Sequence, residues 1–135
     1  MEKKLLILFG FAALFVACKK EITVPNSGIY SGTFTQYDTA GNSAVTGNVY
    51  FVLYESNQTF FVRGDTVTDI PVTHNGSYVV DHSTQMTFKY TGDYDSLIDL
   101  NQYLDTIYNY TFDDINFTLS QTRDGKLYEY IMQRD

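Results

Sequence analysis

Three side chains of this 135-residue chain are suited to covalent or acid–base chemistry near neutral pH: those of Cys18, His74 and His82. Both histidines fall in segments without a strand pattern, so we expect them to be solvated loop residues. No Gly-x-Ser-x-Gly or comparable nucleophile turn is present, and a zinc site needs three or four clustered ligands. The sequence therefore predicts no catalytic residue, no metal and no cofactor, and it favours a protein that is not an enzyme.

Acidic residues over 93–99 (DYDSLID) are spaced as in a calcium-binding loop. An EF-hand loop that began at Asp93 would need glycine in place of Ile98 and glutamate in place of Leu104. Both requirements fail. The segment is then either a looser oxygen-ligand site or, as we expect, a plain solvated loop.

Cys18 is the single cysteine, so the chain cannot form an internal disulfide. It ends an uncharged apolar run, 5–17, that follows Lys3 and Lys4. This run is shorter than the roughly twenty residues that a membrane-spanning helix needs, and it has the layout of an export signal. We predict a signal peptide over 1–17, cleavage before Cys18, and a lipidated cysteine with a short tether over 18–26.

The pair Ala17-Cys18 resembles the lipobox of bacterial lipoproteins, and Lys19-Lys20-Glu21 is similar to the start of mature lipoproteins of the Bacteroidetes. The resemblance implies a diacylglyceryl group on the Cys18 sulfur and a further acyl chain, such as palmitate, on the new amino terminus. Two or more chains give stable anchoring. We therefore expect a cell-envelope protein held by lipid at the outer membrane, on a face that the sequence leaves open.

Four Asp-Ser/Thr pairs followed by a small or aliphatic residue match the O-glycosylation pattern of Bacteroidetes proteins. They lie in or beside the longer loops predicted below. The candidate O-glycosylation sites are Thr39, Thr66, Ser96 and Thr106.

The chain without residues 1–17 has a formal charge of 7 − 15 = −8. This acidic balance argues against binding nucleic acid or anionic lipid surfaces by charge. Twelve tyrosines and ten phenylalanines, with few charged residues, can supply a buried core. We expect one folded domain over 27–135.

Apolar and polar residues alternate with period two through most of this domain. One stretch, 95–103 (DSLIDLNQY), could form a helical turn. Short and longer loops alternate, so an up-and-down meander places every short turn at one end and every longer loop at the other. The sequence thus predicts an all-β, eight-stranded antiparallel up-and-down barrel, a cup with a closed bottom and a looped mouth. The predicted strands are Gly28–Tyr37, Val45–Tyr54, Thr59–Arg63, Gly76–Asp81, Gln85–Tyr90, Leu104–Phe112, Ile115–Gln121 and Lys126–Arg134.

Three hairpins define an expected register that places one apolar face inward. The turns are Asp113-Asp114, Asp124-Gly125 and Ser56-Asn57. The expected pairs are Phe112–Ile115, Tyr110–Phe117 and Tyr108–Leu119 across the first turn, Leu119–Tyr130 and Phe117–Met132 across the second, and Leu53–Phe60 and Phe51–Val62 across the third.

In this layout the chain resembles lipocalin-like domains, and more closely the small lipocalin-like lipoproteins of Bacteroidetes, over nearly all of 28–134. The segments that carry the resemblance are 28–34 (GIYSGTF), 75–78 (NGSY), 108–110 (YNY) and 128–134 (YEYIMQR). The resemblance implies that Arg134 lies across the ring of Tyr30, beside Gly28, at the closed end of the barrel. A stacked, inward-pointing cation on a partly buried ring is expected there.

Inward-facing positions near the mouth combine aromatic rings with hydroxyl or amide tips, which suits an amphipathic guest. The mouth loops carry seven aspartates against Arg123 alone. We expect an electronegative rim that favours a neutral or cationic guest. The predicted lining is Phe34, Gln36, Tyr108, Gln121, Tyr128 and Tyr130; the rim acids are Asp38, Asp65, Asp69, Asp93, Asp95, Asp99 and Asp124.

The leading hypothesis is a lipid-anchored binding module that takes a small apolar or amphipathic molecule into the cup. The alternative is an interaction subunit that contacts another envelope protein, with a barrel filled by its own aromatics and no small ligand. An envelope enzyme has the least support. A cavity of roughly several hundred Å³ would favour the first hypothesis, and a solid core with an exposed apolar patch would favour the second.

Overall fold

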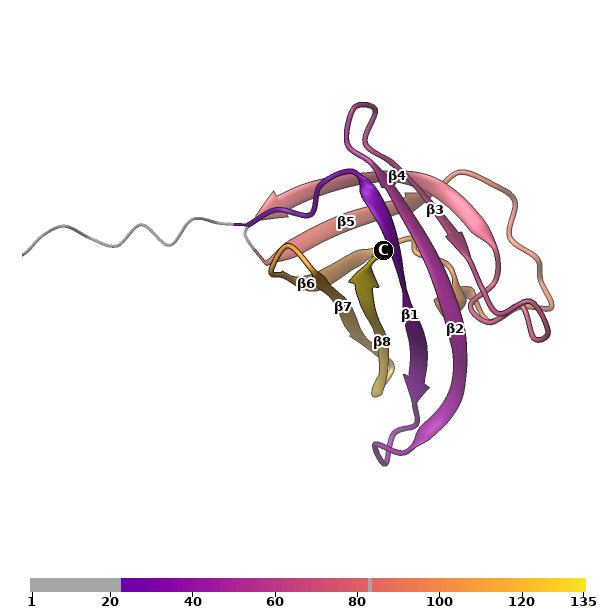
Figure 1. The fold of residues 1–135 in the computed structure, drawn as a ribbon. Coiled ribbons are helices and arrows are strands. Elements are labelled where there is room, and N and C mark those ends of the chain that lie inside the picture. Colours follow the sequence, from indigo (N-terminus) through magenta and orange to yellow (C-terminus); the bar gives the residue numbers. More distant parts are fainter. Residues whose placement is uncertain (1–22, 83) are drawn as a thin grey trace, which may run out of the picture.

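The computed structural model describes residues 23–82 and 84–135, so the predicted signal peptide and Cys18 lie outside the described residues. Eight antiparallel strands form a closed barrel in sequence order, with β8 paired to β1 (Figure 1). The predicted all-β, up-and-down barrel is confirmed. The elements are β1 (Gly28–Tyr37), β2 (Ser43–Tyr54), β3 (Thr59–Arg63), β4 (His74–His82), β5 (Gln85–Tyr90), the 3-10 turn η1 (Leu100–Gln102), β6 (Ile107–Phe112), β7 (Asn116–Arg123) and β8 (Lys126–Arg134).

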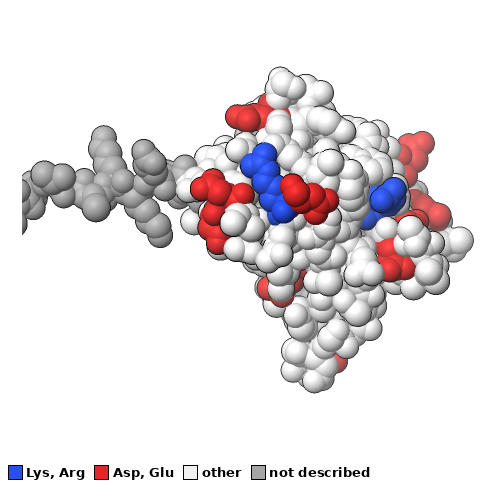
Figure 2. Space-filling view, viewed as in Figure 1, with Lys and Arg blue, Asp and Glu red and all other residues white. Residues whose placement is uncertain are grey.

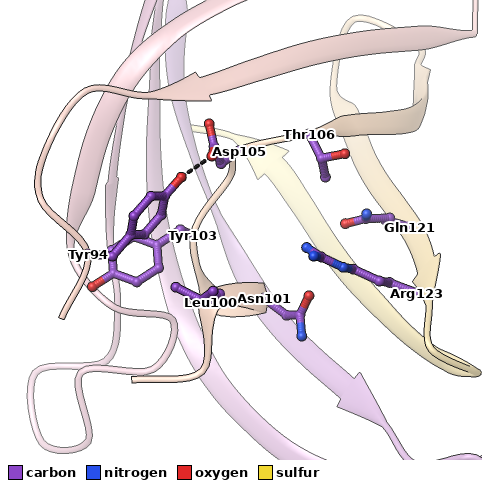
Figure 3. A pocket seen from close by; sticks show the side chains of 8 residues that line it. All are labelled: Tyr94, Leu100, Asn101, Tyr103, Asp105, Thr106, Gln121 and Arg123. Carbon is purple, nitrogen blue, oxygen red and sulfur yellow. Dashed lines mark hydrogen bonds between the residues drawn. The ribbon is translucent and has the colours of Figure 1, made fainter. Parts of the chain in front are cut away.

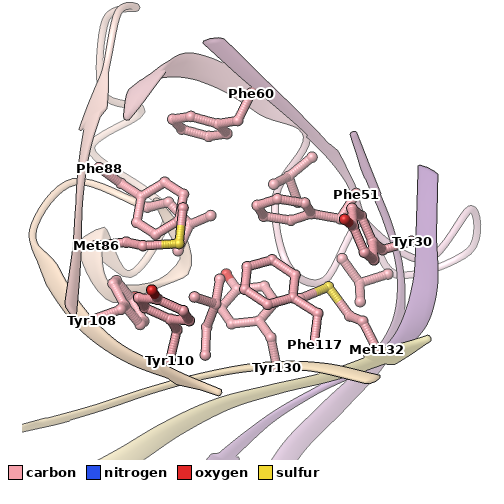
Figure 4. Close-up of a cluster of buried hydrophobic side chains, with 14 of the residues drawn as sticks. Tyr30, Phe51, Phe60, Met86, Phe88, Tyr108, Tyr110, Phe117, Tyr130 and Met132 are labelled. Carbon is pink, nitrogen blue, oxygen red and sulfur yellow. The ribbon is translucent and has the colours of Figure 1, made fainter. Parts of the chain in front are cut away.

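The core consists of the inward-facing side chains of all eight strands, because alternate residues of a strand point to the same face. Phe51 stands among the aromatic rings of this core (Figure 4). Its ring centroid lies 5.8 Å from that of Phe117 and 6.2 Å from those of Phe60 and Phe88. The contacts with Phe88 and Phe117 are edge-to-face, and the ring of Phe60 is nearly parallel to that of Phe51. Rings at such separations form favourable aromatic pairs and fill the barrel.

The expected register is confirmed at two hairpins and wrong at the third. Leu53 pairs with Phe60, and Leu119 pairs with Tyr130, as predicted. At the β6–β7 hairpin, however, Phe112 pairs with Phe117 and not with Ile115. The carboxylate of Asp113 accepts hydrogen bonds from the backbone N–H groups of Ile115 and Asn116 at 3.2 and 2.7 Å.

These bonds make a longer turn than the two residues predicted, so the register moves by two positions. Tyr110 accordingly pairs with Leu119 instead of Phe117. A shift of two residues keeps every side chain on its predicted face. The inward apolar face was therefore predicted correctly, although its cross-strand partners were not.

The start of β6 also differs from the prediction. The strand begins at Ile107 rather than at Leu104, which is fully buried in the preceding loop. The predicted turn within 95–103 is present as η1, with Asp99 as its N-cap. Among residues 23–82 and 84–135, no helix is long and apolar enough to cross a membrane.

The barrel closes where β1 meets β8. Gly32 lies opposite Met132 in this seam, and a Cβ built on Gly32 would stand 2.0 Å from the carbonyl oxygen of Ile131. A side chain at this position would therefore force the two strands apart. The closed seam makes the barrel and its core complete within 28–134.

The two ends of the barrel differ largely as predicted, but the short turn 124–125 between β7 and β8 lies at the mouth with the longer loops. The short connections 55–58 and 113–115 and the end of β4 share one end with the start of β1, and the loops 38–42, 64–73 and 91–106 share the other. The described chain thus enters at the closed end, and the mouth lies at the opposite end (Figure 1). On the face shown in Figure 2, acidic side chains are more frequent than basic ones and lie in separate small groups.

Candidate functional site

A pocket of about 210 Å³ lies at the mouth, between the β5–β6 loop and the end of β7 (Figure 3). Gln121 and Arg123 contribute from β7, and the β5–β6 loop contributes the rest of the lining, Thr106 included. Pockets for drug-sized molecules occupy roughly 300–1,000 Å³, so this one suits a smaller molecule. The lining residues are Tyr94, Leu100, Asn101, Tyr103, Asp105, Thr106, Gln121 and Arg123.

His74 ties the inner part of the β5–β6 loop to the barrel. Its Nε2 accepts a hydrogen bond from the backbone N–H of Leu104 at 2.9 Å, and its Nδ1 lies 2.6 Å from the carbonyl oxygen of Val72. Because a backbone N–H can only donate, Nε2 is unprotonated and Nδ1 donates to Val72. Burial lowers the pKa of His74 to about 4, which keeps the ring neutral near pH 7.

The expectation that both histidines are solvated loop residues is wrong for His74. His74 begins β4 and is only 4 % exposed, while His82, at the other end of that strand, is exposed. The local sequence around His74 contains turn-forming residues, and its burial depends on a loop that packs over it thirty positions later. Such a long-range contact leaves no periodic signal.

Asp105 fastens the outer part of the same loop. Its carboxylate accepts hydrogen bonds from the Tyr94 hydroxyl and, at 2.9 Å, from the backbone N–H of Tyr90. The bond to the Asp105 carboxylate raises the pKa of Tyr94 to about 12. The rings of Tyr90, Tyr94 and Tyr103 pack together with centroids 4.8 to 5.2 Å apart. The loop is thus held over the mouth by a compact aromatic cluster.

The 3-10 turn presents an amide oxygen without a partner. The Asp99 carboxylate accepts hydrogen bonds from the backbone N–H and the side-chain amide nitrogen of Asn101, each at 2.9 Å. This orients the amide and leaves Oδ1 as its free end. That oxygen is buried and accepts no hydrogen bond from any described residue. Since an unpaired buried acceptor is costly, a donor group placed in the pocket would be favourable there.

Gln121 is the one predicted lining residue that contributes to the mouth pocket. The others are packed into the core and are at most 8 % exposed. Gln121 pairs with the buried Tyr128 across β7 and β8, so the pocket begins at the upper edge of the lining that the sequence suggested. The five core residues are Phe34, Gln36, Tyr108, Tyr128 and Tyr130.

Two of these tyrosines carry hydroxyl groups buried among apolar side chains. The hydroxyl oxygens of Tyr108 and Tyr130 have no hydrogen-bond partner among the described residues. Burial raises the pKa of both phenols well above the usual value, so both stay protonated. Both tyrosines therefore belong to the packed core below the mouth pocket.

Five residues of the site were not singled out from the sequence: Tyr94, Leu100, Asn101, Tyr103 and Asp105. All five lie in the β5–β6 loop. The helical-turn signal over 95–103 indicated that this loop has structure of its own. It could not indicate that the bond between His74 and Leu104 would draw the loop inward.

Most of the predicted rim acids organise the loops that carry them. The Asp38 carboxylate accepts backbone hydrogen bonds from Ala40 and Asn42 at 2.9 and 2.8 Å, and that of Asp65 accepts one from Val67 at 2.8 Å. These bonds lower the pKa of both carboxyl groups. Asp69, Asp95 and Asp99 accept similar bonds. Within the described ranges, no group of three His, Cys, Asp or Glu residues is placed to hold a metal ion.

The candidate O-glycosylation sites divide into two groups. Thr39, Thr66 and Ser96 are exposed in the mouth loops. Thr106 is half-buried and lines the pocket. A glycan on Thr106 would therefore compete with any pocket ligand, whereas the other three positions leave the pocket free.

At the closed end, Tyr30 and Arg134 are directly opposite each other in the β1–β8 ladder. The Tyr30 hydroxyl donates to the carbonyl oxygen of Asn26 at 2.9 Å. Arg134 donates to the Asn26 side chain at 2.8 Å and to the Ser27 carbonyl at 3.0 Å, and its guanidinium covers Gly28. Arg134 is exposed, so the expectation of an inward-pointing arginine is wrong. The hydrogen bonds to Asn26 and Ser27 hold the guanidinium against the segment that precedes β1.

A second hollow, of about 250 Å³, lies on the outside of the barrel along β2 and β3. Its cation, Arg63, stands 4.8 Å above the ring of Tyr50. The lining residues are Ser31, Asn48, Val49, Tyr50, Arg63, Gly64, Asp65 and Thr66. Its shape is more open than that of the mouth pocket, so the mouth pocket is the better candidate for a small ligand.

No protein-family model, curated protein or solved structure matches this chain. The class of protein is therefore defined by the fold, a closed eight-stranded antiparallel β-barrel. The functional argument rests on the residues of the mouth pocket.

Proposed function

We propose that the protein is a lipid-anchored binding module of the cell envelope that takes a small amphipathic molecule at the mouth of its barrel. The observation that carries the proposal is the mouth pocket itself, in which the buried Oδ1 of Asn101 has no hydrogen-bond partner among the described residues. The rings of Tyr94 and Tyr103 offer apolar area, while Thr106 and Gln121 offer polar tips. The chemistry is that of binding, with no catalytic residue proposed.

The orientation of the barrel supports a ligand taken from the aqueous side. A lipid on Cys18 would hold the chain near the start of β1, at the closed end. The mouth would then face away from the anchoring bilayer, which we propose is the outer membrane. A ligand that approaches this mouth arrives through water and not directly from the lipid.

An interaction subunit remains the second candidate, favoured by two observations. The barrel interior is filled by packed aromatic rings. In addition, Val67 and Leu97 in the mouth loops are 90 % and 92 % exposed, which suits contact with another protein. The two candidates differ in whether the mouth pocket itself is needed.

Native mass spectrometry of the protein purified from its own cells tests the proposal. We expect a bound small molecule on the unchanged chain and on Ser120→Tyr, whose side chain is on the outer face of β7. Gln121→Tyr, on the inner face, should fill the pocket and lose the adduct. If the unchanged chain carries no adduct, or if Gln121→Tyr retains it, the pocket is not a ligand site and the interaction subunit is favoured.

A further inference from the structure

We propose that the ligand of the mouth pocket is a small carboxylic acid, singly charged, that also carries a hydroxyl or amino group. Arg123 would bind the carboxylate, and Asn101 Oδ1 would accept a hydrogen bond from the second group. This inference rests on the proposed function and names the chemical class of its ligand.

Arg123 differs from the other two arginines of the described chain. Arg134 donates hydrogen bonds to Asn26 and Ser27, and Arg63 stacks on Tyr50. The guanidinium of Arg123 has no such partner within residues 23–82 and 84–135, and it points into the pocket (Figure 3). A guanidinium presents a planar set of donors that matches a carboxylate in a two-point contact.

A second cation lies on the same face of the sheet. Arg123 is paired directly with Lys126 across the β7–β8 hairpin, and cross-strand partners point to the same side. Like charges placed opposite each other on adjacent strands are destabilising. An anion bound at the mouth would relieve this repulsion, which a neutral ligand would leave in place.

The remaining charged residue of the lining, Asp105, does not compete for this role. Both of its carboxylate oxygens already accept hydrogen bonds, from Tyr90 and from Tyr94. Asn101 supplies the complementary acceptor, because its amide nitrogen is held by Asp99 while Oδ1 accepts no hydrogen bond from a described residue. In Figure 3 this oxygen and the Arg123 guanidinium point toward the same space. A ligand that offers one acceptor group and one donor group could bind both the Arg123 guanidinium and Asn101 Oδ1.

The surroundings select the size and charge of the acid. The pocket volume of about 210 Å³ excludes large molecules. The aspartates of the mouth loops still create a negative field around the rim, so a dianion such as phosphate is disfavoured relative to a monoanion. The proposed anionic ligand differs from the neutral or cationic guest expected from the sequence. The reason is that most of those carboxylates bind backbone N–H groups of their own loops, while Arg123 faces the pocket.

Residues 23–135 contain the whole barrel and can be titrated with matched probes while amide NMR signals are followed. The acids are lactate, 4-hydroxyphenylacetate and glucuronate. Each is compared with its own amide, and tyramine supplies a cationic analogue. The variants are Arg123→Gln and, as a matched control outside the pocket, Arg63→Gln.

We expect at least one acid to bind about tenfold or more tightly than its amide and to shift the signals of Asn101 and Gln121. Arg123→Gln should reduce that acid to the affinity of its amide, and Arg63→Gln should leave the preference intact. If an amide or tyramine binds as tightly as the acids, or if Arg123→Gln keeps the preference, the carboxylate assignment fails although the pocket is a ligand site. If no probe binds, the carboxylate assignment fails, and the native mass spectrum then decides the proposed function separately.

Discussion

The imidazole of His74 accepts a hydrogen bond from the backbone N–H of Leu104 at 2.9 Å, across thirty positions of the chain. Both groups are buried. The bond requires an unprotonated Nε2, so the loop that forms the mouth pocket is connected to the barrel through a neutral histidine. Protonation of this ring would replace an acceptor with a donor that faces another donor.

The first prediction concerns stability and pH. The pKa of His74 is about 4 in the folded chain, and its ordinary value is 6.5. Between pH 6.5 and 4, the His74 ring is therefore mostly protonated in the unfolded chain and mostly neutral in the folded chain. The free energy of unfolding should therefore fall as the pH drops from about 6.5 to 4, by about 3 kcal/mol in total. Above this window the His74 contribution is fully present. Urea denaturation at a series of pH values measures the change.

Two histidine variants separate this effect from other titrations. His74→Gln should lower stability at neutral pH and remove most of the pH dependence within the window. His82→Gln, at an exposed position, should retain the pH dependence. A His74→Gln profile that still falls between pH 6.5 and 4 would assign the effect to other groups.

The second prediction compares two buried tyrosines. The Tyr30 hydroxyl donates a hydrogen bond to Asn26, whereas the Tyr130 hydroxyl has no partner among the described residues. Tyr30→Phe should lower the free energy of unfolding by about 1 kcal/mol. Tyr130→Phe should leave it unchanged or raise it by up to about 1 kcal/mol, since it removes a buried group that makes no bond. Equal losses in the two variants, measured by chemical denaturation, would contradict the assignment of Tyr130 as unpaired.

The third prediction concerns the seam that closes the barrel. Gly32→Ala would place a Cβ 2.0 Å from the Ile131 carbonyl oxygen, which is part of the β8 backbone. We expect a loss of about 1–3 kcal/mol in unfolding free energy, because the two strands must separate. Gly28→Ala is the control, since its nearest neighbour, 3.2 Å away, is the flexible side chain of Arg134. Thermal melts that rank Gly28→Ala as the more damaging change would refute the seam argument.

The fourth prediction addresses the anchor. Cys18→Ser removes the sulfur that the lipoprotein pathway would acylate, and the proposed membrane anchoring would need those acyl chains. Cell fractionation should show the unchanged chain with the membranes and the variant in the soluble fraction or as an unprocessed precursor. A variant that is processed normally and still sediments with the membranes would exclude lipidation at Cys18.

The sequence by itself determined the strand pattern and the inward face. Alternation with period two directs Phe51, Phe117 and Tyr130 into the barrel. This holds for any pairing of the strands, because side-chain direction is a local property of a strand. Loop lengths then indicated which end of the barrel is closed. Even the misplaced register at Asp113 preserved the correct face, since the error was two residues.

Only the tertiary structure decided where a ligand could bind. The depth below which side chains fill the barrel depends on how rings from several strands pack together. Phe51, for example, packs against Phe60 and Phe117. The sequence of one strand does not determine this packing. The position of Asn101 depends on a loop that is held by His74. Arg123 differs from Arg63 and Arg134 because it has no partner among the residues that the structure describes. These are relationships between residues far apart in the chain, so the local pattern carries no trace of them.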